Sequence, residues 1–187
     1  MSIKADVQLD AKGLACPMPI VKTKKAMQGL EDGQVLEVIA TDKGSKADLA
    51  AWSKTVGHQY IGTTEEGDVL YHYIRKCNPE ASEAAEKTFE QTVTNEEAIA
   101  ADGIILDVRE AAEYAFGHIP GAKSIPMGEL SARMNELDKA QPTYVICRTG
   151  TRSDMAAQQL AEAGFTNIYN VLPGMSGYAG ELQKEVN

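Results

Sequence analysis

The chain has 187 residues, of which 43% are hydrophobic and 24% charged, a composition typical of folded globular proteins and compatible with one or two compact units. Its net charge is −9, and the acidic excess falls after residue 76, so we expect no nucleic-acid surface, which would need a basic face. We also expect no membrane association, because no run approaches the roughly 18 apolar residues that span a bilayer and the first residues lack the apolar stretch of a signal peptide.

The first 76 residues alternate between strand-like and helix-like segments. Apolar and β-branched runs predict strands at 7–9, 35–39, 60–64 and 69–74, and amphipathic spacing predicts helices at 17–30 and 45–56. The residues Glu65-Glu-Gly-Asp68 indicate a hairpin turn between the last two strands. This βαβαββ order predicts a small two-layer α/β sandwich.

A change of pattern follows at residues 77–90, which carry Asn78-Pro79 and no apolar stripe, so we interpret them as a linker. A second unit then starts at residue 91. Thr94 and Glu97 have the spacing of a capping box for a short helix. Further strands are predicted at 103–108, 123–125, 143–147 and 167–172, and further helices at 111–116, 130–137 and 153–163. Strands that alternate with helices predict a mostly parallel sheet with helices on both faces.

The loop Cys147–Arg152 connects a predicted buried strand to the start of a helix. Cys147 would lie among backbone N–H groups at the positive end of a helix dipole, where the pKa of a cysteine can fall from ~8.5 to roughly 3.5–7.5. Arg148 and Arg152 add two cations, whereas Asp154 in the first helical turn opposes the effect. The pattern therefore makes Cys147 a candidate nucleophile.

Three motifs in the second half resemble those of the single-domain rhodanese sulfurtransferases, in order and spacing, over roughly residues 90–187. They are Asp107-Val-Arg-Glu110, Gly117-His-Ile-Pro-Gly-Ala122 with Ser124-Ile-Pro126, and Cys147-Arg-Thr-Gly-Thr-Arg-Ser153. The resemblance implies a persulfide on Cys147, formed from a small anionic sulfane-sulfur donor such as thiosulfate, a polysulfide or a low-molecular-weight persulfide. The residues implied to hold the sulfur and the donor are those of the loop, Arg148, Thr149, Gly150, Thr151 and Arg152.

Loop length separates this chemistry from that of phosphatases with a rhodanese-like fold, which need five residues between cysteine and arginine. This chain has four, and the tighter loop suits a terminal sulfur atom better than a phosphate. We interpret Asp107 and Arg109 as a structural ion pair and His118 as a residue that fixes its turn. The stretch 172–178 departs from the paired glycine and tryptophan that relatives commonly carry, which we expect to affect packing more than chemistry.

Around Cys16 the sequence reads Gly13-Leu-Ala-Cys-Pro-Met-Pro19, with Thr41-Asp42 after the second strand. Pro17 suits the first position of a helix, so Cys16 would occupy the helix cap, exposed and at the positive dipole end. These motifs resemble the TusA-like sulfur-carrier family over roughly residues 5–76. The resemblance implies that Cys16 receives sulfur as a persulfide and passes it to a partner.

We therefore expect a TusA-like domain at 1–76, a linker at 77–90 and a rhodanese-like domain at 91–187, with Cys147 and Cys16 as the catalytic thiols. The expected partners are the sulfane donor and a protein or low-molecular-weight thiol as acceptor. Two alternatives stay open: Cys16 is silent and its domain docks a partner, or the two cysteines form a redox-switched disulfide. The sequence gives neither the direction of transfer nor the oligomeric state.

Other candidates carry weaker signals. We interpret Cys77 as a bystander, or as a relay stop between the two sites. A zinc site of His58, His72 and Cys77 lacks paired-ligand spacing, so we expect no metal and no cofactor. The lysines 22, 24 and 25 form a solvated face or orient an acidic partner. An odd number of cysteines in no paired spacing favours free thiols and a cytoplasmic location.

Overall fold

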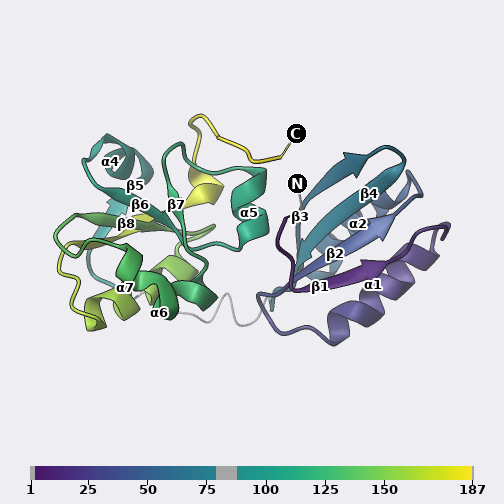
Figure 1. The fold of residues 1–187 in the computed structure, drawn as a ribbon, viewed down its shortest axis with the longest axis horizontal. Coiled ribbons are helices and arrows are strands. Elements are labelled where there is room, and N and C mark those ends of the chain that lie inside the picture. The colour runs from purple at the N-terminus through teal and green to yellow at the C-terminus, as the bar shows by residue number, and fades with distance from the viewer. Residues whose placement is uncertain (1–2, 79–87, 187) are drawn as a thin grey trace. The chain divides into compact units, whose positions relative to one another are not determined.

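The computed structural model describes residues 3–78 and 88–186, and the chain forms two compact units with a boundary between Ala84 and Ala85. Each unit has its own sheet and its own helices (Figure 1). Most of the predicted linker, residues 79–87, lies outside the described residues.

The first unit is a four-stranded sheet packed against two helices. Its elements are β1 (Val7–Asp10), α1 (Met18–Gln28), β2 (Val35–Ala40), α2 (Ser45–Val56), β3 (Gln59–Glu66) and β4 (Val69–Arg75). The strand order is β1-β2-β4-β3, with β1 parallel to β2 and the other neighbours antiparallel. Leu36, Val38 and Ile74 of the central strands pack with Met27 of α1 and Leu49 of α2, because alternate strand residues share one face. The predicted two-layer sandwich is confirmed.

The second unit is built on a five-stranded sheet in which every pair of neighbouring strands is parallel, in the order β5-β9-β8-β6-β7. Its strands are β5 (Thr92–Thr94), β6 (Ile104–Asp107), β7 (Lys123–Ser124), β8 (Thr143–Ile146) and β9 (Ile168–Leu172). Its helices are α4 (Asn95–Ala100), α5 (Ala111–Phe116), α6 (Leu130–Arg133) and α7 (Thr151–Glu162), with short 3-10 turns η1 (Met127–Glu129), η2 (Met134–Glu136) and η3 (Met175–Gly177).

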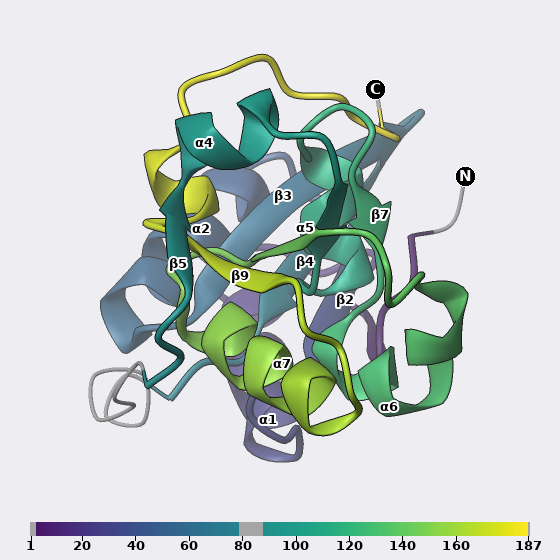
Figure 2. The same cartoon turned by 90° about the vertical axis from the view of Figure 1, so that its left-hand side faces the viewer.

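Helices cover both faces of this sheet, as the alternating pattern predicted. Val145 of β8 packs in a cluster with Leu130 of α6 and Leu160 of α7. Its neighbour Ile146 points the other way, into a cluster with Ala98 of α4. Figure 2 shows α4 on one side of the sheet and α6 and α7 on the other. Strand β8 is therefore buried on both faces and delivers the residue that follows it, Cys147, from the middle of the sheet.

Two predicted helices have different bounds in the structure. The helix expected at 130–137 is α6 followed by η2, because the last turn tightens into the i→i+3 bond from the Leu137 N–H to the Met134 carbonyl. The helix expected at 153–163 begins at Thr151, two residues earlier, and ends at Glu162. The capping box of α4 is present in full, with Thr94 and Glu97 each accepting the other's backbone N–H.

Candidate functional site

Cys147 lies where β8 ends and the loop into α7 begins. Its side chain is 1% exposed and packs with Ala156 and Leu160 of α7. The backbone N–H of Gly150 donates a hydrogen bond to the Cys147 Sγ at 3.1 Å. Gly150 has a φ of 95°, a left-handed conformation that glycine adopts without a Cβ penalty, and it is the N-cap of α7. The sulfur is therefore bound by an amide at the positive end of a helix, as the sequence predicted.

A second contact to the sulfur comes from a buried pair that holds the loop in place. Ser153 Oγ lies 3.3 Å from Cys147 Sγ and donates its proton to Asn170 Oδ1 at 2.6 Å. Asn170, fully buried on β9, donates in turn from Nδ2 to the Gly150 carbonyl at 3.2 Å. Because a serine hydroxyl has one proton, its oxygen accepts the thiol proton of Cys147 in this arrangement. The pair thus links the sulfur, the loop and the neighbouring strand.

Arg152, which the resemblance implies helps to hold the donor, has a partner within the protein. Its guanidinium forms a two-pronged ion pair with Glu113 of α5, with N–O distances of 2.7 and 3.0 Å. The side chain of Glu113 is 1% exposed and that of Arg152 is 13% exposed. The carboxylate neutralises the arginine inside the protein, so Arg152 fixes the start of α7 against α5.

The other loop residues lie closer to solvent. Arg148 and Thr149 are exposed, and Thr151 is half-buried in the first turn of α7. Arg148 is thus the loop arginine whose side chain reaches solvent, where the prediction places a cation for the donor. Its backbone carbonyl, by contrast, accepts a hydrogen bond from the N–H of Ser176 at 2.8 Å.

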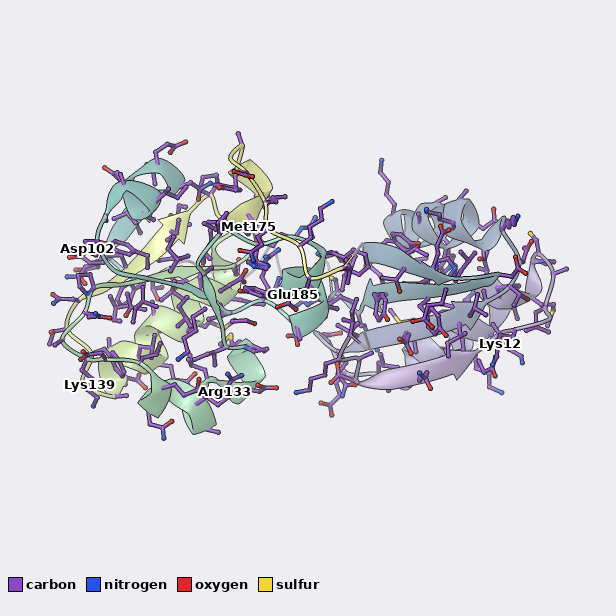
Figure 3. All side chains as sticks on the ribbon, turned by 45° about the horizontal axis from the view of Figure 1, so that its top comes forward. Lys12, Asp102, Arg133, Lys139, Met175 and Glu185 are labelled. Carbon is purple, nitrogen blue, oxygen red and sulfur yellow. The ribbon has the colours of Figure 1, made fainter. Side chains whose placement is uncertain are left out.

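Gly174 allows the segment after β9 to approach the loop closely. The N–H of Met175, which Figure 3 labels, donates to the Cys147 carbonyl at 2.8 Å. A Cβ on Gly174 would lie 2.5 Å from that carbonyl oxygen, and the φ of 84° already disfavours other residues. Asn95 also holds Gly174 in place, because its Nδ2 donates a hydrogen bond to the Gly174 carbonyl at 3.0 Å. The start of the Cys147 loop is therefore held by main-chain hydrogen bonds from Met175 and Ser176, in the segment that follows β9.

Asp107 and Arg109 form the ion pair that the sequence predicted. Arg109 Nη2 lies 2.6 Å from Asp107 Oδ2, and the same nitrogen donates to the Gly117 carbonyl at 2.8 Å. His118 also fixes its turn: its ring stacks on Tyr114 with centroids 3.6 Å apart, and Nδ1 is hydrogen-bonded to the Tyr114 carbonyl. These residues order the end of β6 and the turn that follows α5.

The carboxylate of Asp154 has hydrogen-bond partners outside the cysteine loop. Its two carboxylate oxygens accept the backbone N–H groups of Thr88 and Phe89 at 3.1 and 2.8 Å, and Gln158 Nε2 donates to one of them at 2.7 Å. This buried carboxylate therefore anchors residues 88 and 89, which we had placed in the linker, to α7.

Cys16 lies in the loop between β1 and α1 and is exposed, as predicted. The first helical hydrogen bond runs from the Val21 N–H to the Pro17 carbonyl, so Pro17 is the N-cap and Cys16 precedes it by one residue. The loop is tied to the segment before α2 by the bond from the Gly13 N–H to Thr41 Oγ1, at 2.9 Å.

A carboxylate reverses the electrostatic effect expected at Cys16. The pKa of the Cys16 thiol is raised, first through hydrogen bonding to the side chain of Asp48 on α2. Desolvation and the negative charges of Asp48 and Asp42 act in the same direction. We expected a helix dipole to favour the thiolate, but the nearby acidic groups favour the neutral thiol.

Cys77 follows β4 at the opposite end of the sheet. Arg75, two residues before it, pairs with Val35 at the start of β2, whereas Asp10, six residues before Cys16, pairs with Ile39 near the end of β2. These positions are separated by roughly 13 Å of strand. Cys77 therefore does not touch Cys16 within the folded unit, which argues against a direct handover between them. Its Sγ accepts a hydrogen bond from Arg75 Nη1 at 3.3 Å.

The histidines considered for zinc have other partners. His72 is buried between Ser45 and Tyr60, each 2.9 Å from a ring nitrogen, and burial lowers its pKa to about 4. His58 Nδ1 is within hydrogen-bonding distance of the Cys77 backbone. In residues 3–78 and 88–186 no three His, Cys, Asp or Glu side chains are arranged to hold a metal ion. The lysines 22, 24 and 25 are exposed on α1.

No helix in the described part of the chain combines the length and the apolar character needed to cross a membrane.

Comparison with known families matches both halves of the chain. Residues 7–76 match the family model "Sulfurtransferase TusA", and residues 86–181 match the "Rhodanese-like domain" model. The provisionally named sulfur carrier protein YrkF of Bacillus subtilis is 49% identical over 97% of this chain and 100% of its own length. The sulfur carrier protein TusA of Allochromatium vinosum is 45% identical over 38% of this chain and 93% of its own length.

Among solved structures, a rhodanese-like domain protein from Staphylococcus aureus is 31% identical, with a TM-score of 0.47, over 50% of this chain and 97% of its own.

Proposed function

Because the chain belongs to the TusA and rhodanese-like domain families, we propose that it is a sulfurtransferase that binds sulfane sulfur on Cys147 and passes it through Cys16 to an acceptor thiol. The observation that carries the proposal is the hydrogen bond from the Gly150 amide to the Cys147 sulfur at the start of α7. An amide at a helix start stabilises the negative charge of a thiolate and of a bound persulfide alike.

The first step is nucleophilic attack by the Cys147 thiolate on the outer sulfur of the donor. With thiosulfate, a bond forms between Cys147 Sγ and the transferred sulfur, the donor S–S bond breaks, and sulfite leaves with the electron pair. Arg148, exposed beside the cysteine, supplies the cation that attracts an anionic donor. The loop has four residues between Cys147 and Arg152, which supports a ligand the size of one sulfur atom over a phosphate.

In the second step the Cys16 thiolate attacks the terminal sulfur of the Cys147 persulfide. The new bond forms on Cys16, the bond to Cys147 Sγ breaks, and Cys147 is restored as a thiolate. An acceptor thiol, on a protein or a small molecule, then removes the sulfur from Cys16 in the same way. The odd number of cysteines, in no paired spacing, supports a reducing location such as the cytoplasm.

The relay is tested by mapping persulfides with single-cysteine variants. The full chain is exposed to thiosulfate or polysulfide, blocked with an alkylating reagent, digested, and the persulfide on each cysteine is measured by mass. We expect Cys147→Ser to abolish loading of Cys147 and to reduce loading of Cys16 strongly, whereas Cys77→Ser, the matched control, leaves both unchanged. Undiminished loading of Cys16 in Cys147→Ser would refute the relay.

One observation favours a rival function in which the TusA domain only docks a partner. The raised pKa of Cys16, caused first by its bond to Asp48, makes this thiol a poor nucleophile at rest. In that case Cys16→Ser would deliver sulfur to an acceptor thiol at the full rate. Under the relay, the same variant loads Cys147 normally but loses delivery.

A further inference from the structure

Three buried side chains form a hydrogen-bond chain that ends at the sulfur of Cys147, the reactive atom of the proposed function, on which this inference rests. Ser153 Oγ lies 3.3 Å from Cys147 Sγ, and the same oxygen lies 2.6 Å from Oδ1 of Asn170. The exposed fraction is 0% for Ser153 and Asn170 and 1% for Cys147. Because these groups are shielded from bulk water, each depends on the others for its hydrogen-bond partners.

The sheet register and a second hydrogen bond fix the orientation of the Asn170 amide. Asn170 pairs with Val145 of β8, whose side chain packs against α7, so the Asn170 side chain lies on the same face of the sheet. There its Nδ2 donates to the Gly150 carbonyl at 3.2 Å, which leaves Oδ1 directed at Ser153. A carbonyl oxygen only accepts hydrogen bonds, so Ser153 is the donor of this bond.

Ser153 has one proton for two neighbours. While Cys147 is a thiol, its S–H donates to Ser153 Oγ and the hydroxyl proton goes to Asn170, so every group has a partner. A thiolate has no proton to donate. Its negative charge faces the Ser153 oxygen unless the hydroxyl turns and donates to the sulfur, which leaves Asn170 Oδ1 without that donor. The charge on Cys147 thus decides where the Ser153 proton points.

We propose that Ser153 acts in the release of sulfur from Cys147 by donating its hydroxyl proton to Sγ as that atom becomes a thiolate, and that Asn170 opposes this donation by competing for the same proton. Ser153 is then a catalytic residue, because it contacts the reacting atom. Asn170 is a positioning residue, because it acts through Ser153.

The electron and proton balance of this step involves only Cys147, the incoming nucleophile and water. In the loaded state Cys147 Sγ is bonded to Cβ and to the terminal sulfur and carries no charge, so the hydroxyl stays on Asn170. The nucleophile bonds to the terminal sulfur, the S–S bond breaks, and Sγ keeps the electron pair. The hydroxyl then turns to Sγ and joins the Gly150 amide, which donates at 3.1 Å. Water later supplies the proton that restores the thiol.

This arrangement gives opposite expectations for two neighbours in one hydrogen-bond chain. Removing the hydroxyl of Ser153 takes a charge-assisted hydrogen bond from the leaving thiolate. Removing the acceptor of Asn170 frees the hydroxyl to make that bond. A pair that only held the loop in place would slow the release of sulfur whichever member was removed.

The test is a double-mutant cycle of Ser153→Ala and Asn170→Leu, with the release of sulfur as the readout. Asn170→Leu keeps the approximate size of the side chain but has no acceptor. The full chain carries Cys16→Ser and Cys77→Ser throughout, so Cys147 is its single thiol. It is loaded with thiosulfate, freed of excess donor and mixed with cyanide at one pH, and the formation of thiocyanate gives the single-turnover rate constant.

We expect Ser153→Ala to lower the rate constant for release about tenfold, which corresponds to the loss of one hydrogen bond to a charged group. The change caused by Asn170→Leu is measured twice, once with Ser153 present and once in the Ser153→Ala chain. We expect it to be about two- to tenfold more favourable with Ser153 present. The comparison removes the effect of the lost bond to Gly150, which is the same in both backgrounds.

Thr143→Val is the matched control, because it removes from the neighbouring strand β8 a buried hydroxyl with no hydrogen-bond partner within residues 3–78 and 88–186. It should release sulfur at the rate of the parent chain. Infrared spectroscopy checks the contact itself: the S–H stretching band of unloaded Cys147 should move to higher frequency in Ser153→Ala, which removes its acceptor, and stay in place in Thr143→Val. Should Asn170→Leu fail to give the native circular dichroism spectrum, Asn170→Ala takes its place in the cycle.

The outcomes separate this inference from the function on which it rests. Equal effects of Asn170→Leu in the two backgrounds overturn the role of Asn170. An unchanged release rate in Ser153→Ala overturns the role of Ser153, while Cys147 still loads and the proposed function stands. A parent chain that takes no sulfur on Cys147 overturns the proposed function and the inference with it.

Discussion

Replacing Glu113 by glutamine keeps the shape of the side chain but removes the charge that neutralises Arg152. The pair has N–O distances of 2.7 and 3.0 Å and side chains that are 1% and 13% exposed. At an effective dielectric constant of ~20, unit charges about 3 Å apart attract by roughly 5 kcal/mol. Because removing one partner leaves the other charge buried and unpaired, we expect the second unit to lose about 3–5 kcal/mol of unfolding free energy.

The single tryptophan of the chain, Trp52, gives this experiment an internal reference, because it lies on α2 of the first unit. Urea unfolding of the full chain is followed by tryptophan fluorescence for the first unit and by hydrogen exchange of α5 and α7 peptides for the second. The control is Glu136→Gln, which breaks surface pairs with Arg133 (labelled in Figure 3) and with Lys123, and should shift neither transition by more than about 1 kcal/mol. A loss below about 1 kcal/mol in Glu113→Gln would refute the reasoning, as would an equal shift of the Trp52 transition.

Two further predictions concern stability and the loop. Burial lowers the pKa of His72 to about 4. Between pH 6.5 and pH 4 this histidine is therefore protonated in the unfolded chain but neutral in the folded one. The free energy of unfolding of the first unit should fall over this range by up to about 3 kcal/mol. Urea titrations of Trp52 fluorescence at pH 7 and 4.5 should show this loss and show less of it in His72→Gln, and equal losses in both would contradict it. Gly174→Ala adds a Cβ 2.5 Å from the Cys147 carbonyl oxygen at a φ of 84°, which should destabilise the second unit by at least about 2 kcal/mol and reduce persulfide loading of Cys147. Its control is Gly128→Ala, where a Cβ meets nothing within 4 Å. Equal loading in the two variants would show that persulfide formation on Cys147 does not need the close approach of Gly174 to the loop.

Local signals in the sequence predicted the features that depend on neighbouring residues. The capping box of Thr94 and Glu97, the bounds of α2 and the Asp107–Arg109 pair each involve residues within one or two turns of each other, or a continuous amphipathic pattern. The position of Cys147 was equally predictable, since a buried strand followed by a glycine-containing loop and a helix fixes where the cysteine lies. The two sheets followed from the order of strands and helices.

The contacts that tune the two thiols could not be predicted in this way, because the fold brings their members together from distant parts of the chain. Glu113 and Arg152 are 39 residues apart, and Asn170 reaches Gly150 across 20 residues. Asp48, on α2, raises the pKa of Cys16 although it lies far from that cysteine in the sequence. One signal was available: Asn170 is a polar residue within an otherwise apolar strand, and a buried amide needs partners.

The segment after β9 holds the Cys147 loop through two main-chain donors, the N–H groups of Met175 and Ser176, and these two bonds involve no side chain. Main-chain donors are present whatever residue occupies a position, proline excepted, so positions 175 and 176 are free to vary without loss of these two bonds. Gly174 is the exception, because there the absence of a side chain is itself the requirement. The departure of residues 172–178 from the pattern of relatives is therefore compatible with an intact sulfur site. Within this segment, Gly177 is restricted as well as Gly174, because a Cβ there would meet the ring of Pro173, and Met175 and Tyr178 pack against the core.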